Sequence, residues 1–188
     1  MSWTAIVLAG GKASRFGSDK TRAILHGTPL LERTVSSVAP SVGRVIVVGR
    51  SCPRDWPPHL EEVQFVLDTV PHCGPLGGIV TACSLLNEPF LVAAADLGAL
   101  ESECVRWLLG EFRPDYDVVA VQSSRGLEPL LAIYSPSVLA PAQRAIEGGN
   151  LSLTKLLERL AVFRCDLPSR FRHCTHNVNF PEDLDELQ

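Results

Sequence analysis

The chain has 188 residues, of which 46% are hydrophobic and 20% charged, close to the average for a folded domain. Its formal net charge of −4 argues against a nucleic-acid-binding domain, which normally carries a basic excess. No apolar run approaches the roughly 20 residues of a membrane span, and no signal peptide is visible. We therefore expect one cytoplasmic domain over residues 1–188, without nucleic-acid or membrane partners.

Short runs rich in valine and isoleucine predict buried strands. They are continuous rather than alternating, which is typical of strands buried on both faces of a parallel or mostly parallel sheet. In chain order, the predicted strands cover residues 4–9, 44–49, 63–67, 89–95, 116–122 and 129–134.

Predicted helices lie between and after these strands. Thr28 and Pro29 resemble an N-cap and a first helical residue, Ser135 and Pro136 open a later helix, and Ser152 is a further cap. The predicted helices cover residues 29–39, 76–86, 101–112, 136–147, 153–160 and 181–187. This alternation predicts a three-layer, doubly wound α/β domain with a mostly parallel sheet, in which ligands bind beyond the carboxyl ends of the strands.

The first strand runs directly into "LAGGKASRFGSDK", residues 8–20. Gly10 and Gly11 allow the backbone to approach an anion, Arg15 offers a planar fork for phosphate oxygens, and Lys20 offers a compact positive charge. Four of the chain's 17 basic residues lie within eleven positions here. The loop matches neither the Walker nor the Gly-x-Gly-x-x-Gly pattern. It predicts phosphate binding, and the alternative is a glycine turn with solvated charges.

Two aspartates also follow predicted strands. Asp68 precedes "GPLGG" at residues 74–78, and either binds a ribose hydroxyl or fixes a neighbouring loop as a turn or capping residue. Asp96 follows five apolar or small residues, and a carboxylate at the lip of a buried strand needs a partner such as a cation. Mg²⁺ suits Asp96, because this ion takes one or two carboxylates and fills its other positions with water and phosphate oxygens.

Two segments near the end of the sequence carry candidate ligands. In "NVNFPEDL", Asn177 and Asn179 share a face of an extended segment and could ligate a metal or bind phosphate or a base, unless they serve turn chemistry before the proline. "HCTH", residues 173–176, resembles half of a metal site, but no second cluster of cysteine or histidine completes four ligands. The six cysteines are therefore interpreted mostly as buried thiols of a reducing compartment.

Taken in order, the opening loop, Asp68 with "GPLGG", Asp96, "EPLLAIY" and "NVNFPEDL" resemble the molybdenum cofactor guanylyltransferases, a MobA-like branch of the nucleotidyltransferases. The resemblance covers nearly the whole chain. It implies a Rossmann-like fold and the Mg²⁺-dependent transfer of GMP from GTP to molybdopterin, with release of pyrophosphate. The first half would bind GTP and the second half the pterin, and the molybdenum-insertion enzyme and acceptor molybdoenzymes are the implied protein partners.

The resemblance also assigns roles by position. The implied nucleotide-binding residues are Leu8, Ala9, Gly10, Gly11, Lys20, Asp68 and Asp96. Arg15, Lys20 and Asp96 are the expected catalytic residues, and Asp96 and Asn179 the expected Mg²⁺ ligands. Arg125 is a candidate for the pterin.

The chain departs from the family pattern in two places. "AADLG" stands where the family usually reads Cys-Asp-x-Pro, so the proline that stiffens the turn after Asp96 is missing. Val47 stands at about the position where many members have an asparagine, which weakens the prediction of guanine selection. The alternatives are a transferase of the same fold that uses CTP or a sugar phosphate, and a carrier or regulator that binds GTP without turnover.

Overall fold

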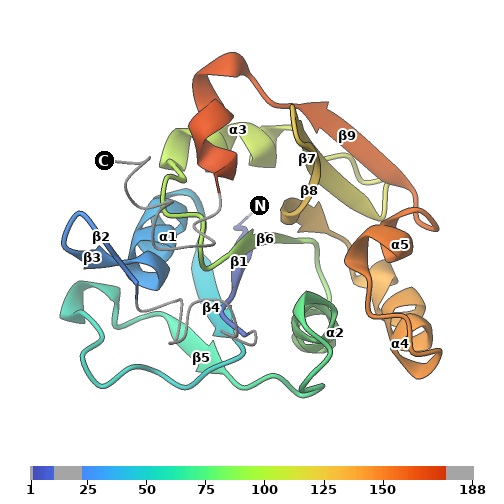
Figure 1. Cartoon of the computed structure of the whole chain (residues 1–188), viewed down its shortest axis with the longest axis horizontal. Coiled ribbons are helices and arrows are strands. Elements are labelled where there is room, and N and C mark those ends of the chain that lie inside the picture. The colour runs from blue at the N-terminus through green and yellow to red at the C-terminus, as the bar shows by residue number, and fades with distance from the viewer. Residues whose placement is uncertain (1, 11–22, 177–188) are drawn as a thin grey trace.

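The computed structural model of the chain describes residues 2–10 and 23–176. Their centre is a seven-stranded sheet in the order β5-β4-β1-β6-β8-β7-β9 (Figure 1). Its strands are β1 (Thr4–Leu8), β4 (Arg44–Val48), β5 (Gln64–Val66), β6 (Phe90–Ala94), β7 (Val118–Ser123), β8 (Gly126–Tyr134) and β9 (Val162–Asp166). All neighbouring pairs are parallel except the two that β8 makes with β6 and β7, so the prediction of a mostly parallel sheet is confirmed.

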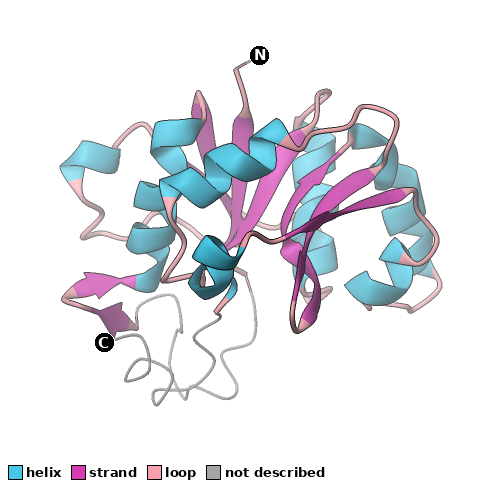
Figure 2. Ribbon diagram, turned by 90° about the horizontal axis from the view of Figure 1, so that it is seen from above, coloured by secondary structure: helices cyan, strands magenta, loops and turns pink. Residues whose placement is uncertain are grey.

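Helices cover both faces of this sheet (Figure 2). One face packs against α1 (Leu30–Val38) and α3 (Ser102–Gly110). The other packs against α2 (Pro75–Leu85), α4 (Leu139–Glu147) and α5 (Leu153–Leu157). Within β1, Ala5 and Val7 belong to the first apolar layer and Ile6 and Leu8 to the second, which explains the continuous apolar run. The three-layer α/β prediction is confirmed.

The expected helix starts are partly right. Thr28 does not cap α1: it pairs with Leu25 in a two-stranded ribbon of β2 (Ile24–Leu25) and β3 (Thr28–Pro29), and Pro29 is the N-cap. The Ser152 hydroxyl accepts a hydrogen bond from the Lys155 amide at 3.3 Å, as predicted for the cap of α5.

Short 3₁₀ turns complete the described elements: η2 (Ala39–Ser41), η3 (Pro58–Leu60), η4 (Pro136–Val138) and η5 (Ser169–Thr175). The turn η4 precedes α4, so that helix begins at Leu139 rather than at Pro136. The predicted helix over 181–187 lies outside the described residues. In the described ranges, no helix is both long and apolar enough to cross a membrane.

Candidate active site

The carboxyl ends of β1, β4, β5 and β6 lie at one edge of the sheet, because these four strands are parallel neighbours. Backbone hydrogen bonds extend the sheet beyond the strands: the Ala9 amide donates to the Val48 carbonyl at 2.8 Å, and the Ala95 amide donates to the Leu8 carbonyl at 3.0 Å. The residues directly after β6 are therefore held beside the end of β1. The predicted nucleotide loop and Asp96 begin at the same edge, as the fold class requires of a ligand site.

Gly10, after β1, and Gly49, after β4, approach each other closely. Gly49 has a φ of +107°, and a Cβ built on it would lie 2.5 Å from the Gly10 nitrogen and 2.6 Å from the Gly10 Cα. Only glycine satisfies both the left-handed backbone and this contact. Gly49 was not among the predicted site residues, although its place at the end of a valine-rich strand is a typical signal of close backbone approach.

Asp68 fixes the loop between β5 and α2. Its Oδ1 accepts hydrogen bonds from the Val70 amide at 2.9 Å and from the Thr81 hydroxyl at 2.8 Å. The "GPLGG" segment packs closely against the same loop. A Cβ built on Gly77 would lie 2.4 Å from the Val70 carbonyl oxygen and 3.0 Å from Asp68 Oδ2. The loop-fixing alternative for Asp68 is thus supported, and its contact with a ribose stays a prediction.

The loop after β6, which carries Asp96, is fixed by a backbone hydrogen bond of its own and by side chains of α1. The Leu97 amide donates to the Ala94 carbonyl at 3.3 Å. Three side chains of α1 donate hydrogen bonds to carbonyls of the loop: Arg33 Nε to Gly98 at 3.0 Å, Thr34 Oγ1 to Ala95 at 3.3 Å and Ser37 Oγ to Leu100 at 2.6 Å. These bonds hold the loop after β6 against α1. Asp96 itself is half-buried at the lip of the strand.

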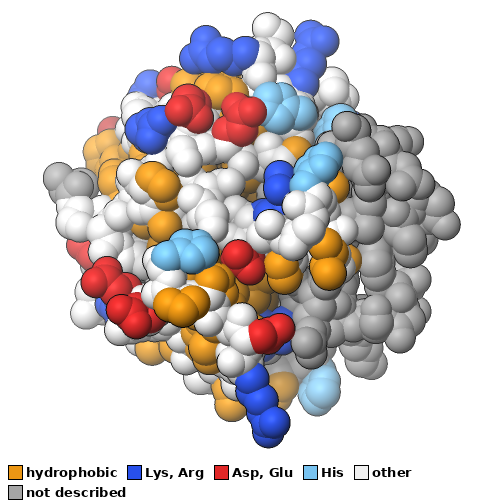
Figure 3. All heavy atoms as spheres, turned by 90° about the vertical axis from the view of Figure 1, so that its left-hand side faces the viewer, with side chains coloured by type: hydrophobic (Ala, Val, Ile, Leu, Met, Phe, Trp, Pro, Cys, Tyr) orange, Lys and Arg blue, Asp and Glu red, His pale blue; other side chains and the backbone are white. Residues whose placement is uncertain are grey.

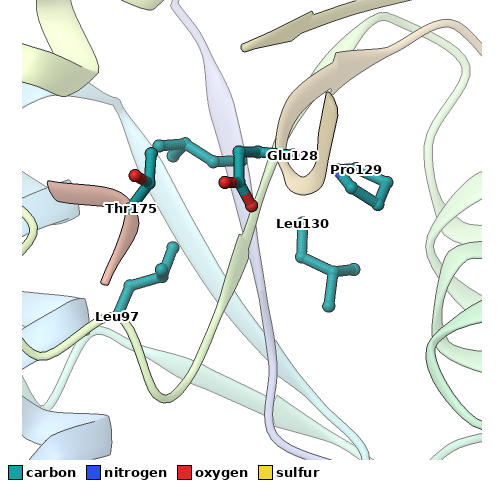
Figure 4. A pocket seen from close by; sticks show the side chains of 6 residues that line it. Leu97, Glu128, Pro129, Leu130 and Thr175 are labelled. Atoms are coloured by element: carbon teal, nitrogen blue, oxygen red, sulfur yellow. The ribbon is translucent and has the colours of Figure 1, made fainter. Parts of the chain in front are cut away.

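A cavity of about 170 Å³ lies next to this loop (Figure 4). Its lining residues are Leu97, Glu128, Pro129, Leu130, Leu131 and Thr175. The Glu128 carboxylate accepts a hydrogen bond from the Ser123 hydroxyl at 2.7 Å, which orients it within the β7–β8 hairpin. The Tyr134 hydroxyl donates to the Pro129 carbonyl at 2.8 Å, and complete burial raises the pKa of Tyr134 well above its ordinary value. The phenol therefore stays neutral and anchors one wall of the cavity.

Arg125, the candidate contact for the pterin, and Val47, which stands where many family members have an asparagine, lie in very different surroundings. The Arg125 guanidinium donates a hydrogen bond to the Thr175 carbonyl and so connects the β7–β8 hairpin to η5. Val47 is completely buried in the apolar layer beneath α1 and α3. Its side chain belongs to the core.

The remaining predicted site residues, Gly11, Arg15, Lys20 and Asn179, lie outside the described residues. Of the predicted set, the structure brings together Leu8, Ala9, Gly10, Asp68 and Asp96 at the carboxyl edge. Figure 3 shows basic, acidic and histidine side chains interspersed on a face that borders the undescribed residues.

An open, mostly parallel sheet with a close glycine contact at the ends of β1 and β4, and with carboxylates after β5 and β6, is typical of nucleotide-binding α/β proteins. Residues 5–168 match the MobA-like NTP transferase domain. The chain belongs to this family, and it is a nucleotidyltransferase.

Known relatives match the chain over nearly its whole length. A probable molybdenum cofactor guanylyltransferase from Thermococcus gammatolerans is 33% identical over 96% of this chain and 96% of its own. One of the same description from Flavobacterium johnsoniae is 28% identical over 98% of this chain and 95% of its own. Molybdopterin-guanine dinucleotide biosynthesis protein A from Archaeoglobus fulgidus, a solved structure, has a TM-score of 0.79 and 28% identity, covering 97% of this chain and 95% of that one. The expected family is thereby confirmed.

Proposed function

We propose that this chain transfers GMP from GTP to molybdopterin, forming the guanine dinucleotide cofactor and releasing pyrophosphate, as a cytoplasmic enzyme of one domain over residues 1–188. The observation that carries the proposal is the position of Asp96. Asp96 lies two residues after the end of β6, and the Ala95-to-Leu8 hydrogen bond of 3.0 Å holds this segment beside the end of β1. The names of the relatives supply the substrates.

The half-buried carboxylate of Asp96 fits Mg²⁺. Asp96 offers a half-buried carboxylate at the lip of the sheet, and Asn179 is proposed as a second oxygen ligand. When bound, Mg²⁺ would supply positive charge to the phosphate oxygens of GTP. Because its loop is held by α1, Asp96 is positioned before substrate arrives, which is the arrangement that electrostatic stabilisation requires.

The proposed reaction is an in-line displacement at the α-phosphorus of GTP. A terminal phosphate oxygen of molybdopterin forms the new bond to this phosphorus while the bond to the bridging oxygen of pyrophosphate breaks. The nucleophile is already anionic, so alignment and charge stabilisation carry most of the rate. The loop of residues 8–11 would hold guanine and phosphates through its backbone, Asp68 and Lys20 would also contact GTP, and Arg15 would bind the departing pyrophosphate.

The cavity beside Asp96 is the proposed position of part of the pterin. Its apolar walls suit a planar ring, and Glu128 offers a carboxylate that can accept hydrogen bonds from the N–H groups of a pterin. The molybdenum-insertion enzyme and the acceptor molybdoenzymes are proposed partners before and after this step.

Pyrophosphate release from GTP, CTP, ATP and UTP, each with Mg²⁺ and with or without molybdopterin, tests the proposal. We expect release that requires the pterin and favours GTP. Asp96→Ala and Lys20→Ala should each lower the rate by roughly 10²- to 10³-fold with the fold intact, the typical cost of one electrostatic contact. Asp166→Ala is the matched control, because Asp166 is also an aspartate at a strand end but is exposed, at the end of β9.

Other outcomes would replace the proposal. Near-normal turnover in the Asp96 or Lys20 variants would refute their assigned roles. Preference for CTP would indicate a cytidylyltransferase of the same fold. Tight GTP binding without release under any condition would indicate a carrier or regulator.

A further inference from the structure

A cluster of metal-ligating side chains lies where α3 meets η5. Glu101 directly precedes α3, whereas His173 and Cys174 lie within η5. His173 Nε2 is 2.9 Å from Glu101 Oε1. One ligand atom from each of these three residues lies within 4.8 Å of the other two. The fold therefore brings a carboxylate, an imidazole and a thiol to one point from segments far apart in the sequence.

Cys104 lies beside this cluster. It lies three residues after Glu101, on the first turn of α3, and its thiol is in hydrogen-bond contact with that of Cys174. Both cysteine side chains are completely buried, whereas Glu101 and His173 are half-exposed. The cluster thus has a buried sulfur donor, Cys174, and a buried imidazole nitrogen, His173 Nε2, next to the half-exposed carboxylate of Glu101.

This combination of donors matches the preferences of Zn²⁺. Zinc is normally held by four ligands in a tetrahedron, and its bonds to sulfur, nitrogen and oxygen place neighbouring ligand atoms about 3.3 to 3.8 Å apart. The 2.9 Å between His173 and Glu101 lies a few tenths of an ångström below that range, so a small opening of the pair would admit the ion. Mg²⁺ prefers oxygen ligands and would not compete here.

We propose that Glu101, His173 and Cys174 bind Zn²⁺ at a site separate from the Mg²⁺ expected at Asp96. Three protein ligands leave the fourth position of the zinc tetrahedron to water. Binding displaces the Cys174 thiol proton to solvent. In the sequence no second cluster accompanies "HCTH", and Glu101 at the start of α3 supplies the further ligand.

The site would fix one wall of the cavity near Asp96. Thr175, which lines that cavity, directly follows Cys174, and its carbonyl accepts the hydrogen bond from Arg125. Zinc would hold η5 to α3, and therefore hold Thr175 in its position.

The test is Zn²⁺ binding to the full chain under reducing conditions, without a histidine tag and in excess Mg²⁺, measured by competition with a chromogenic chelator. We expect one Zn²⁺ per chain. Co²⁺ in its place should give thiolate charge-transfer absorption and the intense visible bands of tetrahedral cobalt. Zn²⁺ should also raise the Tm of the chelator-treated protein.

Single variants distinguish the residues that bind Zn²⁺ from buried cysteines that do not. Cys174→Ser should weaken Zn²⁺ binding by more than about 100-fold, whereas Cys104→Ser, which changes only a neighbour of a ligand, should weaken it by about 10- to 100-fold. His173→Ala should weaken it as strongly as Cys174→Ser, and its half-exposed side chain can be removed without opening the core. Cys165→Ser is the matched control, because Cys165 is another buried thiol of the same apolar layer, and it should leave binding unchanged.

Two results would overturn the proposal. One is Zn²⁺ affinity that is equal in wild type and in His173→Ala. The other is no Zn²⁺ binding by the reduced protein together with a Cys104–Cys174 disulfide after mild treatment with a disulfide oxidant, which would make this a redox-active thiol pair. Because these readouts do not involve GTP turnover, they stand apart from the proposed transferase activity.

Discussion

Replacing Gly49 by alanine should displace the start of the predicted nucleotide loop, because the added Cβ would clash with the backbone of Gly10. The added Cβ would meet the Gly10 nitrogen at 2.5 Å and the Gly10 Cα at 2.6 Å, where ordinary contact begins at 3.4 Å. The loops after β1 and β4 would have to separate by about 1 Å, because no side-chain rotation relieves a clash between backbones. The φ of +107° adds strain of about 1 to 3 kcal/mol. We expect Gly49→Ala to lose about 2 to 4 kcal/mol of the free energy of unfolding.

The functional effect should exceed what lost stability alone produces. A misplacement of about 1 Å near reacting groups can cost about 10²-fold in rate. Urea unfolding gives the stability, and pyrophosphate release at a temperature where the variant is fully folded gives kcat and KM for GTP.

Gly149→Ala is the control for Gly49→Ala. Gly149 has a φ of +72° after α4, but a Cβ there meets nothing within 4 Å, so this variant bears only the backbone strain of about 1 to 2 kcal/mol. If Gly49→Ala proved as stable and as active as Gly149→Ala, the close approach of Gly49 and Gly10 would be refuted.

Three further predictions concern α2 and its surroundings. Thr81→Val should cost about 2 kcal/mol in urea unfolding, because the Asp68 carboxylate loses its 2.8 Å hydrogen bond. Gly77→Ala should raise KM for GTP, because its Cβ would lie 2.4 Å from the Val70 carbonyl oxygen, and an unchanged KM would contradict the role of this turn. Burial raises the pKa of Cys83 to about 12 from 9.0, so its contribution to stability is complete below pH 9 and is lost between pH 9 and 12. From pH 8 to pH 10, wild type should lose about 1 kcal/mol more than Cys83→Ala in urea unfolding.

The central fold could be predicted because its strands are apolar on both faces. The six predicted strands all exist, since a continuous run of Val, Ile and Ala is stable only between two layers of helices. β9 was not predicted, because it is an edge strand with polar Arg164 and Asp166 in a run of five residues. The reversed direction of β8 also leaves no local signal, since direction depends on which neighbour the strand pairs with.

Site residues could be predicted where they end a strand and not where they act from a neighbouring helix. Asp68 and Asp96 each follow an apolar run, so their place at the carboxyl edge followed from the fold class. Thr81 lies 13 residues from the aspartate it binds, and Ser37 lies 63 residues from the carbonyl it holds. Such pairs are brought together by the packing of helices on the sheet, which no local pattern records.

The missing proline after Asp96 illustrates how one physical requirement can be met in two ways. A proline stiffens a turn by restricting the unfolded chain, whereas α1 stiffens this turn through hydrogen bonds that exist only in the folded state. The second solution couples the position of Asp96 to the packing of α1. Arg33, Thr34 and Ser37 therefore belong to the positioning of the carboxylate, although we assign none of them a contact with substrate. In this chain the turn after Asp96 lacks the proline, keeps the carboxylate and is held to α1 by side-chain hydrogen bonds.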